Sequence, residues 1–150
     1  MTKFLLFLSL MCFSCFSAQL LSFENLQHLS HSSEQILDTQ LSAHFDLLHH
    51  PEDSKENIKV YSNKHLSDSK FTVLTVFLKD LGCHVFSIVS HDIEQVELFK
   101  NNLRTDQFQS EIIQNNAGEE LHVYTDKKIK ILIKNPDPSL DAHQIVWMCK

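Results

Sequence analysis

The apolar residues of this 150-residue chain recur at two different spacings, and each spacing predicts a kind of element. Over residues 23–45 they recur every three or four positions, which predicts one amphipathic helix. The following apolar positions fall on one side of that helix: Phe23, Leu26, Leu29, Ile36, Leu37 and Leu41. A second helix is predicted to begin near Asp92, a good N-cap whose capping partner would be Gln95. Its apolar stripe contains Ile93, Val96, Phe99 and Leu103.

Six segments are predicted to be β-strands, because apolar residues alternate in them or form short runs between polar turns. They are residues 58–62, 71–78, 84–90, 121–125, 129–134 and 144–149. In the fifth segment, three isoleucines alternate with Lys130, Leu132 and Lys134, which indicates one buried face and one mostly solvated face. Gly82 lies in a stretch that predicts a tight hairpin connection.

The order of one helix and three strands occurs twice, and the two copies share a short sequence similarity. Residues 57–64 align with residues 120–127 at an offset of 63, with a Val, a Tyr and a Lys identical. Phe45 and Phe108 match at the same offset. We therefore predict an α+β fold, in which two tandem αβββ units form one antiparallel sheet with two helices packed on one face. The units span about 23–90 and about 92–150.

The two predicted units differ mainly in their loops. In the first unit, residues 63–69 join the first strand pair and a tight turn joins the second. In the second unit the first pair is joined tightly, and residues 135–142 join the second. Loops that differ on a shared scaffold are suited to recognising a specific partner. Drift of unconstrained surface loops would explain either of them by itself.

The first residues have the composition of a cleaved secretory leader. Lys3 supplies a positive charge, residues 4–11 are mostly apolar, and residues 16–18 end in small side chains near a cleavage point. The apolar run is shorter than the roughly 20 residues that a membrane-spanning helix needs. We therefore predict a periplasmic or secreted protein with a single domain over residues 19–150. A lipoprotein anchored through Cys15 is the alternative.

This order of elements, together with the leader, resembles β-lactamase-inhibitor-like proteins and small exported bacterial proteins. The resemblance covers most of the chain after the leader. It contains no functional motif, so no site residue is carried over from it. It implies a sheet that presents a binding surface.

Charge and glycine content exclude several classes of function. The chain has 13 Lys and Arg against 19 Asp and Glu, a net charge of −6, which argues against binding to nucleic acid or anionic lipid. Its 2 glycines cannot build a glycine-rich phosphate loop. We expect no cofactor, no nucleic-acid partner and no stable membrane insertion of the mature chain.

Cysteines and histidines are the residues that could carry chemistry. Cys83 and Cys149 remain after leader cleavage, and an oxidising compartment permits a disulfide, although the sequence leaves open whether the two residues are close enough to bridge. His28 and His31 lie three residues apart on one predicted helix face, with Glu24 one turn earlier. Without a known zinc motif, a solvated polar face is the simpler interpretation, and we predict no specific metal site.

No catalytic arrangement is evident. Cys83 and His84 are adjacent in a predicted strand, so their side chains point to opposite faces and are not expected to act as nucleophile and base. No nucleophilic serine motif or pair of facing carboxylates is present in the sequence. We therefore do not predict an enzyme.

The strongest functional signal is that several strands are apolar on both faces. Two helices can cover one face of a sheet, so apolar side chains on the other face would form an interaction patch, unless the N-terminal segment or the loops cover it. We predict a non-catalytic binding module that holds a protein partner on this open face and on the two long loops. The residues predicted to bind the partner are Leu74, Val76, Phe86, Ile88 and Trp147.

Several roles fit such a module. An inhibitor, an immunity-type protein, an envelope-assembly factor or a homodimer would each satisfy the description. A carrier of a small apolar ligand or a metal ion is one alternative. A hydrolase whose residues converge only in three dimensions is another.

Overall fold

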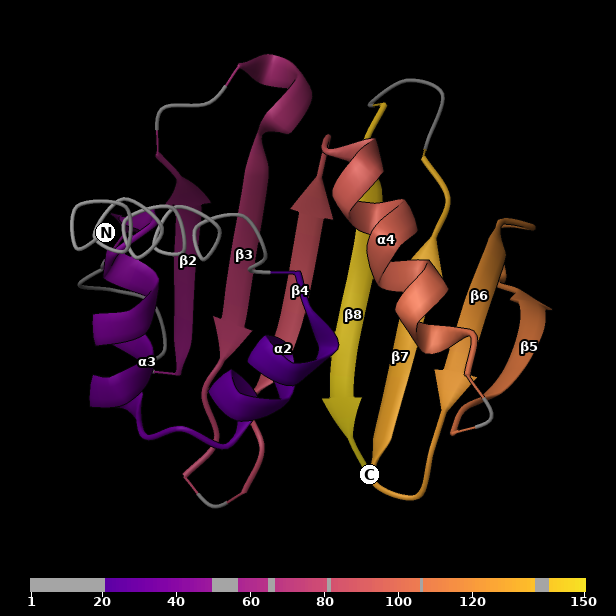
Figure 1. Cartoon of the computed structure of the whole chain (residues 1–150), viewed down its shortest axis with the longest axis horizontal. Helices are drawn as coiled ribbons and strands as arrows, with labels where there is room; N and C mark the ends of the chain where they lie inside the picture. The colour runs from indigo at the N-terminus through magenta and orange to yellow at the C-terminus, as the bar shows by residue number, and fades with distance from the viewer. Residues whose placement is uncertain (1–20, 50–56, 65–66, 81, 106, 137–140) are drawn as a thin grey trace, which may run out of the picture.

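A computed structural model describes residues 21–49, 57–64, 67–80, 82–105, 107–136 and 141–150. The described residues form an eight-stranded antiparallel sheet with three α-helices, which confirms the α+β class (Figure 1). The predicted leader, with Cys15, lies outside the described residues. None of the described helices is both long and apolar enough to cross a membrane.

The strand order is β1-β2-β3-β4-β8-β7-β6-β5, with every neighbouring pair antiparallel. The strands are β1 (Phe45–His49), β2 (Ile58–Asn63), β3 (Thr72–Phe77), β4 (Val85–Ser90), β5 (Gln109–Gln114), β6 (Glu120–Thr125), β7 (Ile129–Lys134) and β8 (His143–Cys149). Each half of the chain is a four-stranded meander, and β4 pairs with β8 where the halves meet. The strand order is symmetric about the β4–β8 pair. The sequence duplication stays a prediction.

The predicted unit of three strands was too small. The six predicted strands correspond to β2–β4 and β6–β8, and β7 has the predicted bounds. The structure adds an edge strand to each half, β1 and β5. All six residues of β5 are exposed, so no buried stripe distinguishes this strand in the sequence.

The helix predicted over residues 23–45 is in fact two helices, α2 (Phe23–Ser30) and α3 (Glu34–Ser42). Ser33 starts the second helix, because its Oγ accepts a hydrogen bond from the backbone N–H of Ile36. Such a cap satisfies a backbone donor that has no acceptor within the helix. The other predicted helix is α4 (Ile93–Leu103), and Asp92 caps it by accepting from the N–H of Gln95.

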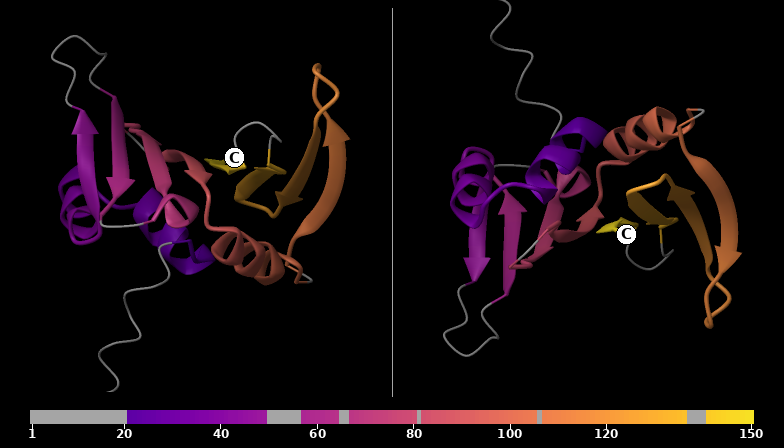
Figure 2. Two further views of the ribbon diagram at one scale, coloured as in Figure 1. Left: turned by 90° about the horizontal axis from the view of Figure 1, so that it is seen from above. Right: turned by 90° about the horizontal axis from the view of Figure 1, so that it is seen from below.

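The hydrophobic core lies between the helices and one face of the sheet. Figure 2 shows the three helices on the same side of the sheet, and no described helix over the other side. The helices contribute the following buried side chains: Leu26, Leu29, Leu37, Leu41, Val96, Phe99 and Leu103. Burial of this apolar surface is the main source of stability in such a two-layer fold.

An ionic cluster attaches α3 to the sheet. The Lys59 Nζ of β2 lies 2.7 Å from a Glu34 oxygen and 2.6 Å from an Asp38 oxygen, and the Tyr61 hydroxyl donates to Asp38. Burial acts to lower the pKa of Lys59, but the hydrogen bonds to Asp38 and Glu34 outweigh it and raise the pKa. Lys59 therefore stays charged, and the cluster fixes α3 over β2.

Candidate functional site

The five residues predicted to bind a partner lie beneath the helices. Each of them has an exposed fraction of 0%: Leu74, Val76, Phe86, Ile88 and Trp147. The Trp147 ring also packs against Phe23 of α2, with 5.3 Å between ring centroids. The predicted face was therefore wrong. The helices cover the face that carries the largest apolar side chains, because burying those side chains removes the most apolar surface from water.

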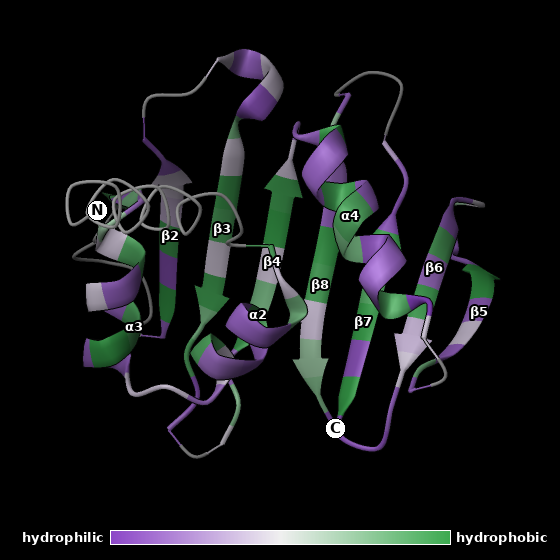
Figure 3. Ribbon diagram, viewed as in Figure 1, coloured by the Kyte–Doolittle hydropathy of each residue, from purple (hydrophilic) through white to green (hydrophobic). Residues whose placement is uncertain are grey.

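The opposite face of the sheet carries the alternate residues of the same strands. On β2, β3 and β4 this face is formed by nine residues without charge, which we name the open-face patch: Ile58, Val60, Ser62, Val73, Thr75, Phe77, Val85, Ser87 and Val89. All of them except Ser62 are at least partly exposed. Figure 3 shows the hydrophobic stretches along these strands.

The exposed apolar side chains of the open-face patch lie in two groups. Ile58, Phe77 and Val89 are 41%, 38% and 37% exposed. Phe77 is the register partner of Ile58 on one side and of Val85 on the other. Register partners in a sheet point to the same face with their side chains in contact range. Ile58, Phe77 and Val85 thus form one apolar row across three strands, and Val89 lies beside Val73 beyond the polar pair of Thr75 and Ser87.

In the other half of the sheet, the same face becomes charged at β7. On β7 it carries Lys130 and Lys134 on either side of Leu132. Lys134 forms an ion pair with Glu119, with 2.5 Å between the charged atoms. β8, which lies between β4 and β7, has no charged residue on this face, so the uncharged surface extends from β2 to β8.

A signal for the open face was present in the sequence. Lys130 and Lys134 identify the solvated face of β7, because they alternate with buried isoleucines. The polar residues Thr75 and Ser87 alternate with buried apolar residues in the same way on β3 and β4. The rule fails on β2, where the polar residue that alternates with Ile58 and Val60 is Lys59, which is buried on the helix side of the sheet.

The described residues of the two loops predicted to recognise a partner lie at the same end of the sheet (Figure 1). The short helix η1 (Asp68–Lys70) begins within the first loop, and Asp141 belongs to the second. With residues 91–94 they line an open cleft of about 540 Å³. The cleft is predominantly acidic, with carboxyl groups from Asp68, Asp92, Glu94 and Asp141. Residues 137–140 of the second loop lie outside the described residues.

His28 and His31 do not belong to one group of potential metal ligands, although both line a shallow cleft with Glu24. His28 lies within α2, whereas His31 follows the last residue of that helix, and both are exposed. The His28 Nε2 lies 3.2 Å from the Gln40 Nε2. Among the described residues, a group of three potential metal ligands occurs at one place, and it contains His31 without His28.

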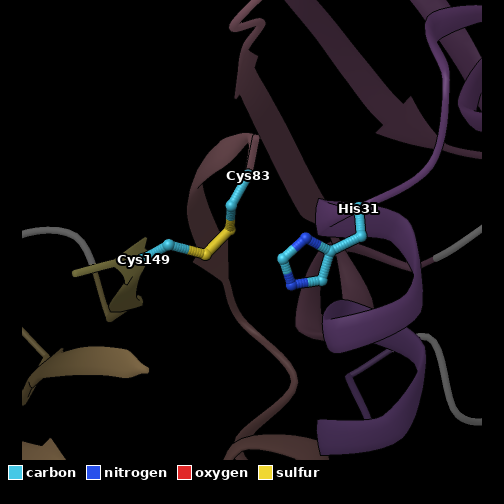
Figure 4. Close-up of side chains that lie close together, drawn as sticks. All are labelled: His31, Cys83 and Cys149. Atoms are coloured by element: carbon cyan, nitrogen blue, oxygen red, sulfur yellow. A yellow bond between two sulfur atoms is a disulfide. The ribbon is translucent and has the colours of Figure 1, made fainter. Parts of the chain in front are cut away.

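That group consists of His31, Cys83 and Cys149 (Figure 4). The two cysteines form a disulfide with 5.9 Å between their Cα atoms. Their sulfurs and a ring nitrogen of His31 all lie within 4.8 Å of one another. The three residues come from the end of α2, the β3–β4 connection and the end of β8, so no sequence spacing could reveal the group.

His84 holds His31 beside Cys83. Its backbone N–H donates to the Ser30 carbonyl at 2.8 Å, and its Nε2–H donates to the Ser32 carbonyl at 2.9 Å. Its Nδ1 accepts from the backbone N–H of Lys79 at 3.1 Å. The residue next to Cys83 thus binds both neighbours of His31, and its ring nitrogens are fully occupied by backbone groups.

No family model matches the chain, and neither a curated protein nor a solved structure is significantly similar to it. The resemblance to β-lactamase-inhibitor-like proteins therefore stays a prediction. The open-face patch, the acidic cleft at the loop end of the sheet and the group around His31 are the features from which a function can be inferred.

Proposed function

We propose that the protein is an exported, non-catalytic binding module that holds a protein partner on the open-face patch and the adjoining loops. One observation carries the proposal. Three adjacent strands present a surface without charged side chains, and no described element lies over it. Contiguous apolar surface is scarce on soluble monomers and commonly marks a protein interaction site.

The charges around the patch indicate the chemistry of the partner. The chain has a net charge of −6, and the cleft at the loop end of the sheet contains four carboxyl groups. A basic protein with an apolar contact surface fits both features. Burial of the apolar surfaces would supply affinity, and attraction between opposite charges would speed association and orient the partner.

The biological role depends on which kind of protein the partner is. An inhibitor would cover the active site of a secreted enzyme, an immunity-type protein would neutralise a toxin, and an envelope-assembly factor would hold a subunit. A second copy of the chain would use the same patch to form a homodimer.

Site-specific photo-crosslinking tests the patch, with Phe77 as the probe position and Leu98 as the matched control. The two side chains are 38% and 44% exposed, but Leu98 lies on α4, across the sheet from the patch. In producing cells we expect a discrete adduct from position 77 and none from position 98. Mass spectrometry of the adduct identifies the partner, and a mass of twice the chain identifies a homodimer. The same adducts from both positions, or none from positions 58, 77 and 89, would contradict the proposal.

A substitution then measures the contribution of the patch. Val89→Lys places a charge on the patch, and Leu98→Lys places one on the helix face. We expect Val89→Lys to weaken binding of the identified partner by at least about tenfold, because a charge buried in an interface has to be desolvated. Leu98→Lys should bind like the wild type.

A further inference from the structure

We propose that His31, Cys83 and Cys149 form a redox-gated site for a soft divalent metal ion, with Zn²⁺ as the fitting ion. In the oxidised protein the two sulfurs are bonded to each other. In the reduced protein, two thiolates and one imidazole provide three ligands of the kinds that zinc prefers. The inference is independent of the partner proposed above, because it involves none of the patch residues.

The distances are close to those that a zinc ion requires. The three ligand atoms lie within 4.8 Å of one another. Tetrahedral zinc, with bonds of about 2.3 Å to sulfur and about 2.0 Å to nitrogen, places its ligand atoms roughly 3.5–3.8 Å apart. Side-chain rotation after reduction is enough to separate the sulfurs and to bring the imidazole closer. A water molecule would complete the coordination.

The surrounding backbone holds the ligands without help from the disulfide. His84 binds the carbonyls of Ser30 and Ser32, on either side of His31, and so couples α2 to the loop of Cys83. Cys149 is the register partner of Ile129 in the β7–β8 ladder. The next N–H along, that of Lys150, donates to the Lys128 carbonyl at 2.8 Å. Since no sulfur takes part in these contacts, reduction leaves the three ligands together.

Exchange with a dithiol would open the site. One thiolate of the dithiol attacks the sulfur of Cys149, which is the more exposed residue of the two, and Cys83 leaves as a thiolate. The second thiol of the dithiol then closes its own disulfide and releases Cys149. The dithiol loses two electrons and two protons, and the protein gains them as two thiols.

Zinc binding then displaces both thiol protons to solvent. Two thiolates and a neutral imidazole around Zn²⁺ have no net charge, which suits a site that includes the buried Cys83.

Titration of the purified protein with Co²⁺ tests the site, in the oxidised form and after reduction with a phosphine. Tetrahedral Co²⁺ bound to thiolates has charge-transfer and visible absorption bands that a surface histidine site lacks. In the reduced protein we expect stoichiometric Co²⁺ binding with these bands, and we expect Zn²⁺ to displace the Co²⁺. In the oxidised protein we expect no stoichiometric Co²⁺ binding and none of these bands.

His31→Ala and His28→Ala are a matched pair for the ligand assignment, since both residues are exposed histidines at the end of α2. We expect His31→Ala to weaken Co²⁺ binding by the reduced protein by at least about tenfold, and His28→Ala to leave it unchanged. Equal binding by His31→Ala and wild type would overturn the proposal. So would the absence of thiolate–cobalt bands after reduction, or loss of the native circular dichroism spectrum on reduction, which would make the disulfide purely structural.

Discussion

His143, at the start of β8, is 4% exposed, and its Nδ1 has no hydrogen-bond partner among the described residues. Burial lowers the pKa of His143 below the ordinary value of 6.5, and the nearby Lys100 ammonium lowers it further. Glu97 and Asp141 act in the opposite direction without cancelling the effect. The folded protein therefore favours the neutral imidazole.

This preference predicts a loss of stability as the pH falls below about 6.5, because the unfolded chain then takes up a proton that the folded chain resists. In His143→Asn this contribution is absent. Between about pH 7.5 and about pH 5.5, the free energy of unfolding should fall less in the variant than in the wild type. Urea unfolding at both pH values measures the difference. His44→Asn, at an exposed position, is the control and should behave like the wild type.

Short-range signals at single residues could be predicted from the sequence. Asp92 caps α4 through a residue three positions away, so the contact is already encoded in a four-residue window. The contact between His31 and the cysteines depends instead on how three distant segments meet, and no local pattern encodes it. Whether a contact can be predicted here depends on the sequence separation of its residues and not on their type.

At the scale of single elements, β7 separates the two faces of the sheet most clearly. Ile131 is 0% exposed beneath the helices, whereas the adjacent Leu132 is partly exposed on the open face. Ile131→Ala should lower the free energy of unfolding by about 2–5 kcal/mol, because it leaves a cavity in the core. Leu132→Ala should lower it by about 1 kcal/mol or less. Chemical denaturation of both variants measures the losses, and equal losses would contradict the assignment of faces.

The bounds of β7 were predictable because its isoleucines alternate with polar or half-buried residues. β5 is held by backbone pairing with β6, and all of its residues are exposed. Its sequence therefore has no alternation of buried and exposed residues to recognise. The break at Ser33 was hidden for another reason. The buried leucines of α2 and α3 face the same layer of the core, and their helical spacing continues across the break.

At the scale of the whole molecule, the disulfide ties the entrance of β4 to the end of β8. The bonded residues are separated by 66 positions, and the described part of the closed loop contains α4 and the five strands β4 to β8. In the chain-entropy description, closing a loop of this length stabilises a fold by about 4 kcal/mol. The double variant Cys83→Ser with Cys149→Ser should remain folded and lose about this much.

Urea unfolding without reductant measures this loss. The reduced, metal-free wild type should match the double variant, since both lack the same constraint. A double variant as stable as the oxidised wild type would contradict the expected role of the disulfide.

The meeting of the two recognition loops also belongs to this scale. Each loop is visible in the sequence as a polar stretch. The two loops line one cleft because β4 pairs with β8, and this pairing places the second half of the sheet beside the first. Strand order of this kind cannot be read from residue patterns, because many orders satisfy the same alternation.

The pairing of β4 with β8 also determines how the molecule assembles. Every other neighbouring pair in the sheet joins strands that follow each other along the chain, and such hairpins form from nearby residues. The β4–β8 pair joins residues that are far apart in the sequence. Its formation therefore has the larger loop-closure entropy cost, and this pair should form last during folding. In this strand pair, Trp147 of β8 lies opposite Phe86 of β4, and it is the only tryptophan of the chain. Its fluorescence is therefore a built-in reporter of the moment at which the two halves become one sheet.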